Sequence, residues 1–167
     1  MSKYIFISGG VISGVGKGVS AASIAFLLKS YGKKVTLLKA DPYINIDAGT
    51  MNPLEHGETF VLEDGFETDM DIGTYERFTN QSFARLNSMT LGAVLESVIK
   101  KERALEYKGR WVSLDHHVPE NVVQWIEEVA KKDKADITIV EIGGTVGEIA
   151  NGLMLTANKI MKLKNPK

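Results

Sequence analysis

The sequence predicts an α/β protein with a doubly wound, mainly parallel sheet and helices on both faces. Three runs rich in β-branched residues, at about 4–8, 34–39 and 136–142, lack the polar–apolar alternation of half-exposed strands. Segments with apolar residues at helical spacing lie between them. Strands that alternate with helices in this way favour right-handed crossovers and a parallel sheet that is covered on both faces.

The first strand-like run leads directly into a glycine-rich loop. Residues 8–18 contain five glycines and Lys17, and such a backbone points successive N–H groups at an anion. Apolar residues then recur at helical spacing, at Ala21, Ile24, Ala25 and Leu28. The loop therefore lies at a helix N-terminus, where the helix dipole also favours phosphate. We predict a loop that binds a nucleoside triphosphate; the alternative is a glycine-rich turn that binds no ligand.

This loop departs from the common G-x-x-x-x-G-K-[ST] pattern in two ways. Gly10 lies seven residues before Lys17, one more than in that pattern. Gly18 follows the lysine, at the position where a serine or threonine hydroxyl normally contacts Mg²⁺. A metal ion at this site therefore requires carboxylates from elsewhere in the chain.

Polar residues also end the second and third strand-like runs. Lys39 and Asp41 end the second, and Glu141 ends the third, just before the glycine-containing segment 143–147. Ligands of open parallel sheets bind beyond the carboxyl ends of the strands. We therefore expect these groups and the loop to converge on one edge, with Lys39 one strand away from the loop.

Three further helices and one long irregular segment complete the expected organisation. Apolar faces at helical spacing are formed by Leu91, Val94, Leu95, Val98 and Ile99, by Val122, Ile126, Val129 and Ala130, and by Leu153, Ala157, Ile160 and Met161. Residues 41–78 show little periodicity and many acidic and turn residues. Long excursions of this kind are usually functional or disordered, and the aromatic residues of this one indicate order.

Composition restricts the functional classes. The chain has 167 residues, a formal net charge of −1 and no cysteine. Near-neutrality argues against a nucleic-acid partner, and the absence of cysteine excludes disulfides and thiolate chemistry. No apolar run reaches the roughly 18 residues of a membrane span. We expect a single cytoplasmic domain, residues 1–167, with neither nucleic acid nor membrane as a partner.

Several long strings of the sequence resemble CTP synthase. They are the loop at 9–18 and the segments 41–51, 56–58, 63–73, 75–78, 101–103 and 141–147. The resemblance implies a P-loop NTPase-like fold of the dethiobiotin-synthetase type and an ATP-dependent ligase that aminates UTP to CTP. In that family ATP phosphorylates the uracil 4-oxygen, and ammonia then displaces the phosphate.

The resemblance also assigns roles to individual residues. Lys17 and Lys39 are the expected catalytic residues, since Lys17 holds ATP phosphates and Lys39 approaches the transferred phosphoryl group. Asp71 and Glu141 are the expected Mg²⁺ ligands. The expected nucleotide-binding residues are Ser13, Gly14, Val15, Gly16, Lys17, Gly18, Val19, Asp71 and Glu148. Of these, Ser13 and Glu148 match positions that hold the pyrimidine nucleotide, UTP or CTP, while His56 matches a position near the active site.

The match to the family is dense over about residues 1–78 and thinner after about residue 80, where two places depart from it clearly. Residues 111–119 differ from the family's strand with a Val-Ile-Pro-His-type ending. After Gly147 the family usually continues Asp-Ile-Glu-Ser, whereas this chain has Glu148-Ile149-Ala150-Asn151, which keeps the first acid and lacks the second.

The chain is also shorter than family members, which carry a longer synthetase domain and a glutamine amidotransferase domain with a catalytic cysteine. We therefore expect a C-terminally shortened synthetase domain, either a short paralogue or an excised piece, that uses ammonia at most. A sheet that lacks strands exposes a new edge, which predicts a homo-oligomer, a dimer or a tetramer. The alternatives are an incomplete ATP- and pyrimidine-nucleotide-binding module that self-associates or regulates a full-length synthase, and a P-loop ATPase of the dethiobiotin-synthetase type.

Overall fold

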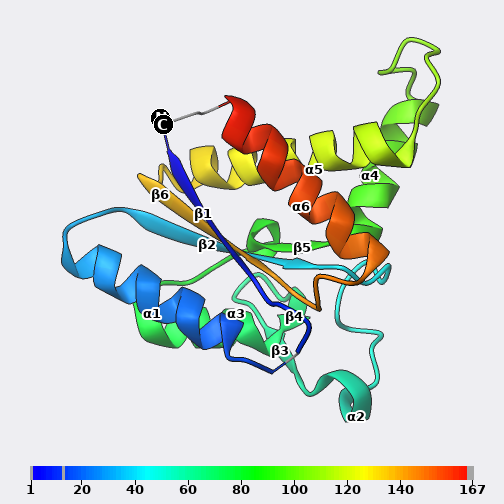
Figure 1. Cartoon of the computed structure of the whole chain (residues 1–167). Coiled ribbons are helices and arrows are strands. Elements are labelled where there is room, and N and C mark those ends of the chain that lie inside the picture. Colours follow the sequence, from blue (N-terminus) through cyan, green and yellow to red (C-terminus); the bar gives the residue numbers. More distant parts are fainter. Residues whose placement is uncertain (1, 13, 165–167) are drawn as a thin grey trace.

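A four-stranded parallel sheet forms the centre of the computed structural model, which describes residues 2–12 and 14–164 (Figure 1). The strand order is β1 (Lys3–Ser8), β6 (Ile137–Ile142), β2 (Val35–Asp41) and β5 (Ser88–Thr90). All neighbouring pairs in this sheet run parallel. The predicted α/β class and the three long strands are thus confirmed, with small shifts at the strand ends.

One expectation about strand order is wrong. Lys39 was expected one strand away from the glycine-rich loop, but β6 lies between β1 and β2. In the parallel register Lys39 is paired with Glu141, and Ile7 is paired with Glu141 from the other side. Sequence order does not fix spatial order in a parallel sheet, because each crossover can pass over a neighbouring position. Glu141 therefore stands at the middle of the carboxyl edge.

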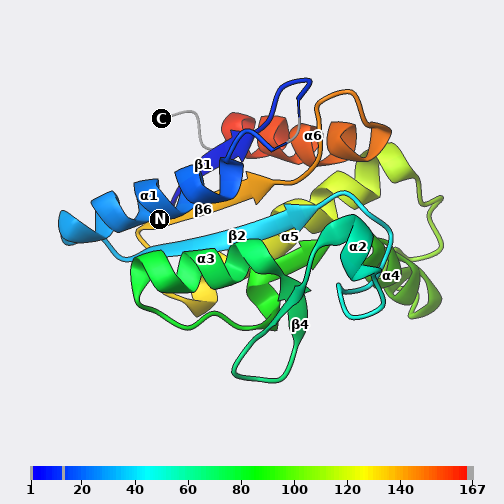
Figure 2. The same ribbon diagram turned by 90° about the horizontal axis from the view of Figure 1, so that it is seen from below.

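Helices cover both faces of the sheet, as predicted. Helices α1 (Lys17–Ser30) and α3 (Met70–Thr79) lie on one face, and α4 (Leu91–Arg103), α5 (Leu114–Lys132) and α6 (Ile149–Lys164) lie on the other (Figures 1 and 2). Successive residues of a strand face opposite sides. Accordingly, Leu37 and Ile139 belong to the core under α1 and α3, whereas Leu38 and Val140 belong to the core under the other three helices.

The two inner strands fit the prediction of double-sided burial better than β1 does. Every residue of β2 is buried, and β6 is buried from Thr138 to Ile142. Strand β1, which pairs only with β6 among the described strands, keeps residues 4–7 only partly buried. The edge position of β1 explains this difference, because one side of its backbone has no neighbouring strand.

The segment at 41–78 is more regular than its sequence indicates. It contains the short helix α2 (Pro53–His56), an antiparallel hairpin of β3 (Thr59–Val61) and β4 (Glu67–Asp69), and all but the last residue of α3. The Asp69 side chain accepts a hydrogen bond of 2.8 Å from the backbone N–H of Asp71 and so caps α3. The segment is therefore ordered, as its aromatic content predicts.

The altered region at 111–119 forms a loop and a helix start. Residues 111–113 are in neither helix nor strand, and α5 begins at Leu114 and contains Pro119. Nδ1 of His117 accepts a hydrogen bond of 3.1 Å from the backbone N–H of Ser113, which ties the loop to the first turn of α5.

Among the described helices, none has the length and apolar composition needed to cross a membrane.

Candidate functional site

A cavity of about 820 Å³ lies at the carboxyl edge of the sheet, where the sequence predicts a site. Its walls come from the glycine-rich loop, from the ends of β2 and β6, and from the start of α3. The lining includes Gly14, Val15, Gly16, Lys17, Gly18, Val19, Lys39, Asp71, Glu141 and Glu148. The structure thus brings together every described residue that was predicted to bind nucleotide or metal. Ser13, the remaining predicted residue, lies outside the described residues.

The glycine-rich loop ends in a helix start that no side chain caps. Gly16 is the N-cap of α1 in a left-handed conformation with φ of 80°, and no side chain accepts a hydrogen bond there. The first N–H groups of a helix have no partner within the helix. These donors, together with the helix dipole, make the start of α1 suitable for an anion.

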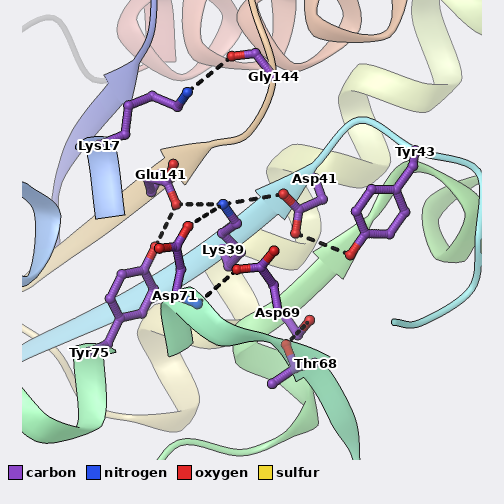
Figure 3. Close-up of polar contacts among 11 residues, drawn as sticks. Lys17, Lys39, Asp41, Tyr43, Thr68, Asp69, Asp71, Tyr75, Glu141 and Gly144 are labelled. Atoms are coloured by element: carbon purple, nitrogen blue, oxygen red, sulfur yellow. Dashed lines mark hydrogen bonds and ion pairs between the residues drawn. The ribbon is translucent and has the colours of Figure 1, made fainter. Parts of the chain in front are cut away.

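Lys17 is held at the mouth of the loop by the segment that follows β6. Its Nζ donates a hydrogen bond of 3.1 Å to the backbone carbonyl of Gly144 (Figure 3). A lysine that binds phosphate contributes a mobile point charge. Here one hydrogen bond to a backbone carbonyl positions that charge. A phosphate that binds Lys17 would have to displace only this carbonyl.

Asp71 explains the glycine that follows Lys17. A Cβ added to Gly18 would lie 2.6 Å from Cγ of Asp71 and even closer to Oδ1. The Asp71 carboxylate therefore stands against the backbone of α1, at the position where the common pattern has a hydroxyl. This close approach gives the loop a carboxylate oxygen in place of a serine or threonine oxygen.

Lys39 lies at the centre of a cluster of three carboxylates. Its Nζ is 2.7 Å from Oδ2 of Asp71, 2.9 Å from Oε2 of Glu141 and 3.3 Å from Oδ1 of Asp41 (Figure 3). Burial alone lowers the pKa of Lys39, but the charges of Asp41 and Glu141 outweigh it and place the pKa well above the usual lysine value. The ammonium is therefore charged and shared among side chains from β2, α3 and β6.

Glu141 is buried and carries one oxygen without a partner. Its Oε2 accepts a hydrogen bond of 2.7 Å from the hydroxyl of Tyr75, in addition to the ion pair with Lys39. Its Oε1 is buried and has no hydrogen-bond partner among the described residues. Burial, followed by the charge of Glu141, raises the pKa of Tyr75 well above the usual tyrosine value, so the phenol stays protonated and donates.

Three further residues belong to this site. Asp41 was expected at this edge without a defined role, whereas Tyr43 and Tyr75 were not predicted. Burial raises the pKa of Asp41 to about 7, even though Lys39 opposes the shift. The hydroxyl of Tyr43 lies 3.3 Å from Oδ2 of Asp41. Residues two apart on a strand share a face, so the spacing of Lys39 and Asp41 was a usable signal. No sequence pattern pairs Tyr75 with Glu141, because that contact depends on how α3 packs.

The remaining predicted residues lie around the rim. Glu148 turns back on its own loop, where Oε1 accepts hydrogen bonds of 3.1 Å from both the N–H and the hydroxyl of Thr145. His56 packs edge-on against the ring of Tyr43 at 5.6 Å between ring centroids. Among the described residues, no group of three or more His, Cys, Asp and Glu side chains forms a ready metal site.

A parallel sheet with a glycine-rich loop at its carboxyl edge, leading into an uncapped helix start, defines a P-loop-like α/β domain. Comparison with known proteins identifies the family within this class. The profile of the CTP synthase N-terminus matches residues 3–167, and the chain belongs to that family.

Curated relatives agree with this assignment. The chain is 50% identical to a CTP synthase of Prochlorococcus marinus (strain NATL1A) over 162 residues, or 97% of the chain. It is 51% identical to the CTP synthase of Prochlorococcus marinus (strain MIT 9312) over 165 residues, or 99% of the chain. It is 53% identical over 149 residues, or 89% of the chain, to a CTP synthase of Synechococcus sp. (strain RCC307). These alignments cover 29%, 30% and 27% of the relatives, so the chain spans less than a third of their length.

Proposed function

We propose that this chain is an ATP-dependent amidoligase-type domain that converts UTP, ATP and ammonia to CTP, ADP and phosphate through a 4-phosphorylated UTP. The observation that carries the proposal is the position of Lys39, within 3.3 Å of three carboxylates beside an uncapped helix start. Phosphoryl transfer needs mainly positioning and charge neutralisation. A buried lysine next to a phosphate-binding loop supplies both.

Each residue has a defined task in this proposal. Lys17 and the N–H groups at the start of α1 bind the ATP phosphates. Lys39 faces the transferred phosphoryl group from the side of β2, opposite the loop. The γ-phosphoryl moves to the uracil 4-oxygen; ammonia then attacks C4, loses a proton, and the C–O bond to phosphate breaks.

The carboxylates at the site fit Mg²⁺. Asp71 and Glu141 already share one cation, the Lys39 ammonium, and the buried Oε1 of Glu141 has no partner among the described residues. Mg²⁺ is commonly bound by one or two carboxylates, with phosphate oxygens and water as the other ligands. We assign Asp71 and Glu141 as its protein ligands. When bound, the ion neutralises charge on the ATP phosphates.

Two observations favour a second candidate, a nucleotide-binding module without turnover. The chain has Ala150 where the family usually has an acid, and Glu148 is engaged by Thr145 within its own loop. Both observations concern the segment after Gly147 that is expected to hold the pyrimidine nucleotide. Such a module would bind ATP or a pyrimidine nucleotide and act by association with itself or with a full-length synthase.

Incubation of the chain with ATP, Mg²⁺, UTP and ammonium distinguishes the candidates. CTP is followed by absorbance and ADP by its release, in the wild type, in Lys17→Ala and in Lys33→Ala. Lys33 is an exposed lysine beyond the C-terminal end of α1, so its variant is the matched control. CTP formation that disappears only in Lys17→Ala supports the proposal. ADP without CTP indicates an ATPase or another acceptor, and nucleotide binding without either product supports the module.

A further inference from the structure

The carboxylate cluster holds more negative than positive charge. Among the described residues, Lys39 is the one cation paired with Asp41, Asp71 and Glu141. The exposed fractions of these carboxylate side chains are 6%, 35% and 1%, so Asp41 and Glu141 have almost no water to stabilise them. Burying a carboxylate is unfavourable unless it is paired and hydrogen-bonded. The unpartnered Oε1 of Glu141 shows that one lysine does not satisfy the cluster.

The three partners of Lys39 are not equivalent. Asp71 belongs to the first turn of α3, on a different element from Lys39, and is partly exposed to the cavity. Glu141 belongs to β6 and is shared with Tyr75. Asp41 lies two residues after Lys39 on the same strand, so both side chains are fixed to one rigid backbone.

Asp41 is also packed closely against its neighbours. A Cβ on Gly143 would contact its Oδ1 and would lie 3.4 Å from its Cγ. On the other side, the Tyr43 hydroxyl lies 3.3 Å from Oδ2. The position of Asp41 beside Lys39 therefore depends on neither Asp71 nor a direct contact with the Glu141 side chain.

We propose that Lys39 is a built-in competitor of the divalent cation for Asp71 and Glu141, and that Asp41 is the positioning residue that receives Lys39 when the cation takes those two carboxylates. This inference rests on the metal ligands of the proposed function and adds an exchange of partners to them. The cation replaces the ammonium at Asp71 and Glu141. Lys39 keeps its pair with Asp41 and is free on its other side to approach a phosphate.

The test is the affinity of the nucleotide-free chain for Mn²⁺, measured by electron paramagnetic resonance of the free ion and by calorimetry. Lys39→Gln removes the competing charge and keeps a hydrogen-bond donor, so Mn²⁺ binding tightens by roughly tenfold. Lys39→Met serves as a second variant without a donor, and Lys33→Gln as the matched surface control. Circular dichroism checks that each variant folds. General damage to the fold weakens Mn²⁺ binding, so tightening is a result that misfolding does not produce.

Asp41→Asn gives the opposite result. Lys39 then has only Asp71 and Glu141 as partners, and Mn²⁺ binds more weakly than in the wild type. When Asp41→Asn is added to Lys39→Gln, it lowers the Mn²⁺ affinity less than in the wild type, because that background has no ammonium for Asp41 to pair with. Unchanged or weaker Mn²⁺ binding in both folded Lys39 variants overturns the competition, and an equal loss on Asp41→Asn in both backgrounds overturns the role of Asp41.

The outcome is independent of the proposed reaction. If the chain makes no CTP but its variants show this order of Mn²⁺ affinities, the ligase activity is refuted and the exchange of partners is supported. If the chain makes CTP but its variants do not show this order, the activity is supported and the exchange is refuted. Adding Asp71→Asn to Lys39→Gln locates the ion, because the tightened binding is lost if Mn²⁺ sits at these carboxylates.

Discussion

The carboxylate of Asp71 occupies the space that any side chain at Gly18 would need. The two residues come from α3 and α1, which pack side by side on the same face of the sheet. The contact turns an apparent defect of the loop, a missing hydroxyl, into a requirement of the fold. It also makes the start of α1 and the start of α3 parts of one site.

Gly18→Ala is therefore expected to destabilise the chain. The new methyl group pushes against the Asp71 carboxylate, and overpacking of this kind costs about 1–3 kcal/mol. Urea denaturation measures the loss, and Mn²⁺ affinity is expected to fall with it because Asp71 is displaced. Gly10→Ala is the matched control, since nothing lies within 4 Å of a Cβ added there. Equal stability of the two variants contradicts the contact.

Tyr75→Phe tests the hydrogen bond to Glu141. The substitution leaves Oε2 of a buried carboxylate with Lys39 as its partner and removes the 2.7 Å contact. Losing a hydrogen bond to a buried charged group costs about 1–3 kcal/mol, which chemical denaturation resolves. Tyr31→Phe, at a tyrosine that is 79% exposed, is expected to change little. A neutral Tyr75→Phe variant argues that Glu141 finds another donor.

Asp41 gives the stability a characteristic pH dependence. Burial raises its pKa to about 7 in the folded chain, above the ordinary aspartate value of 3.8, so between these two values the folded state binds the extra proton. The contribution of Asp41 to the free energy of unfolding is therefore fully present below pH 3.8 and is lost as pH rises through about 7. The free energy of unfolding falls there by up to about 1.4 kcal/mol per pH unit. Denaturation with EDTA present, repeated for Asp41→Asn, is expected to show a flatter profile in the variant.

Asp64 supplies the control of opposite sign. The backbone N–H of Arg85 lowers its pKa, so its contribution is present above pH 3.8 and is lost as pH falls further. Asp64→Asn is thus expected to act only at the acid end. If Asp41→Asn and Asp64→Asn change the same part of the profile, the assignment of the neutral-pH slope to Asp41 is wrong.

The edge of β1 supports the predicted self-association. One side of β1 has no neighbouring strand among the described residues, and residues 4–7 are only partly buried. Such edges pair or become covered. Light scattering across a dilution series is expected to give a mass above that of the 18.3 kDa chain. A monomeric mass at every concentration contradicts the expectation.

The sequence predicts the long elements and the edge where the site lies, because these depend on local patterns. Runs of β-branched residues mark β2 and β6, and apolar spacing marks α4, α5 and α6. The three-residue strands β3, β4 and β5 are too short to show a pattern. Helix α3 is missed because its buried residues include Gly73, Tyr75 and Thr79, which do not form an apolar stripe.

The contacts within the site depend on information that no local pattern carries. Glu141 meets Lys39 because β6 lies beside β2, and that order is set by how the crossovers pack. The family resemblance indicates Lys17, Lys39, Asp71 and Glu141 as a set without giving their geometry. The sequence places Asp41 at this edge, but its ion pair with Lys39 and the contact of Tyr75 with Glu141 are known only from the structure.

The place of β6 between β1 and β2 has a consequence for how this chain folds. Strands β1 and β2 do not pair with each other. Among the described strands β1 pairs only with residues 137–142, and β2, which also pairs with β5, is joined to β1 only through these residues, about a hundred residues after β2. Pairings of such long range form slowly. On a ribosome, the N-terminal half must wait for this late strand before its sheet closes. Because the same strand carries Glu141, the nascent chain gains a central strand of its sheet and the central acid of its site together.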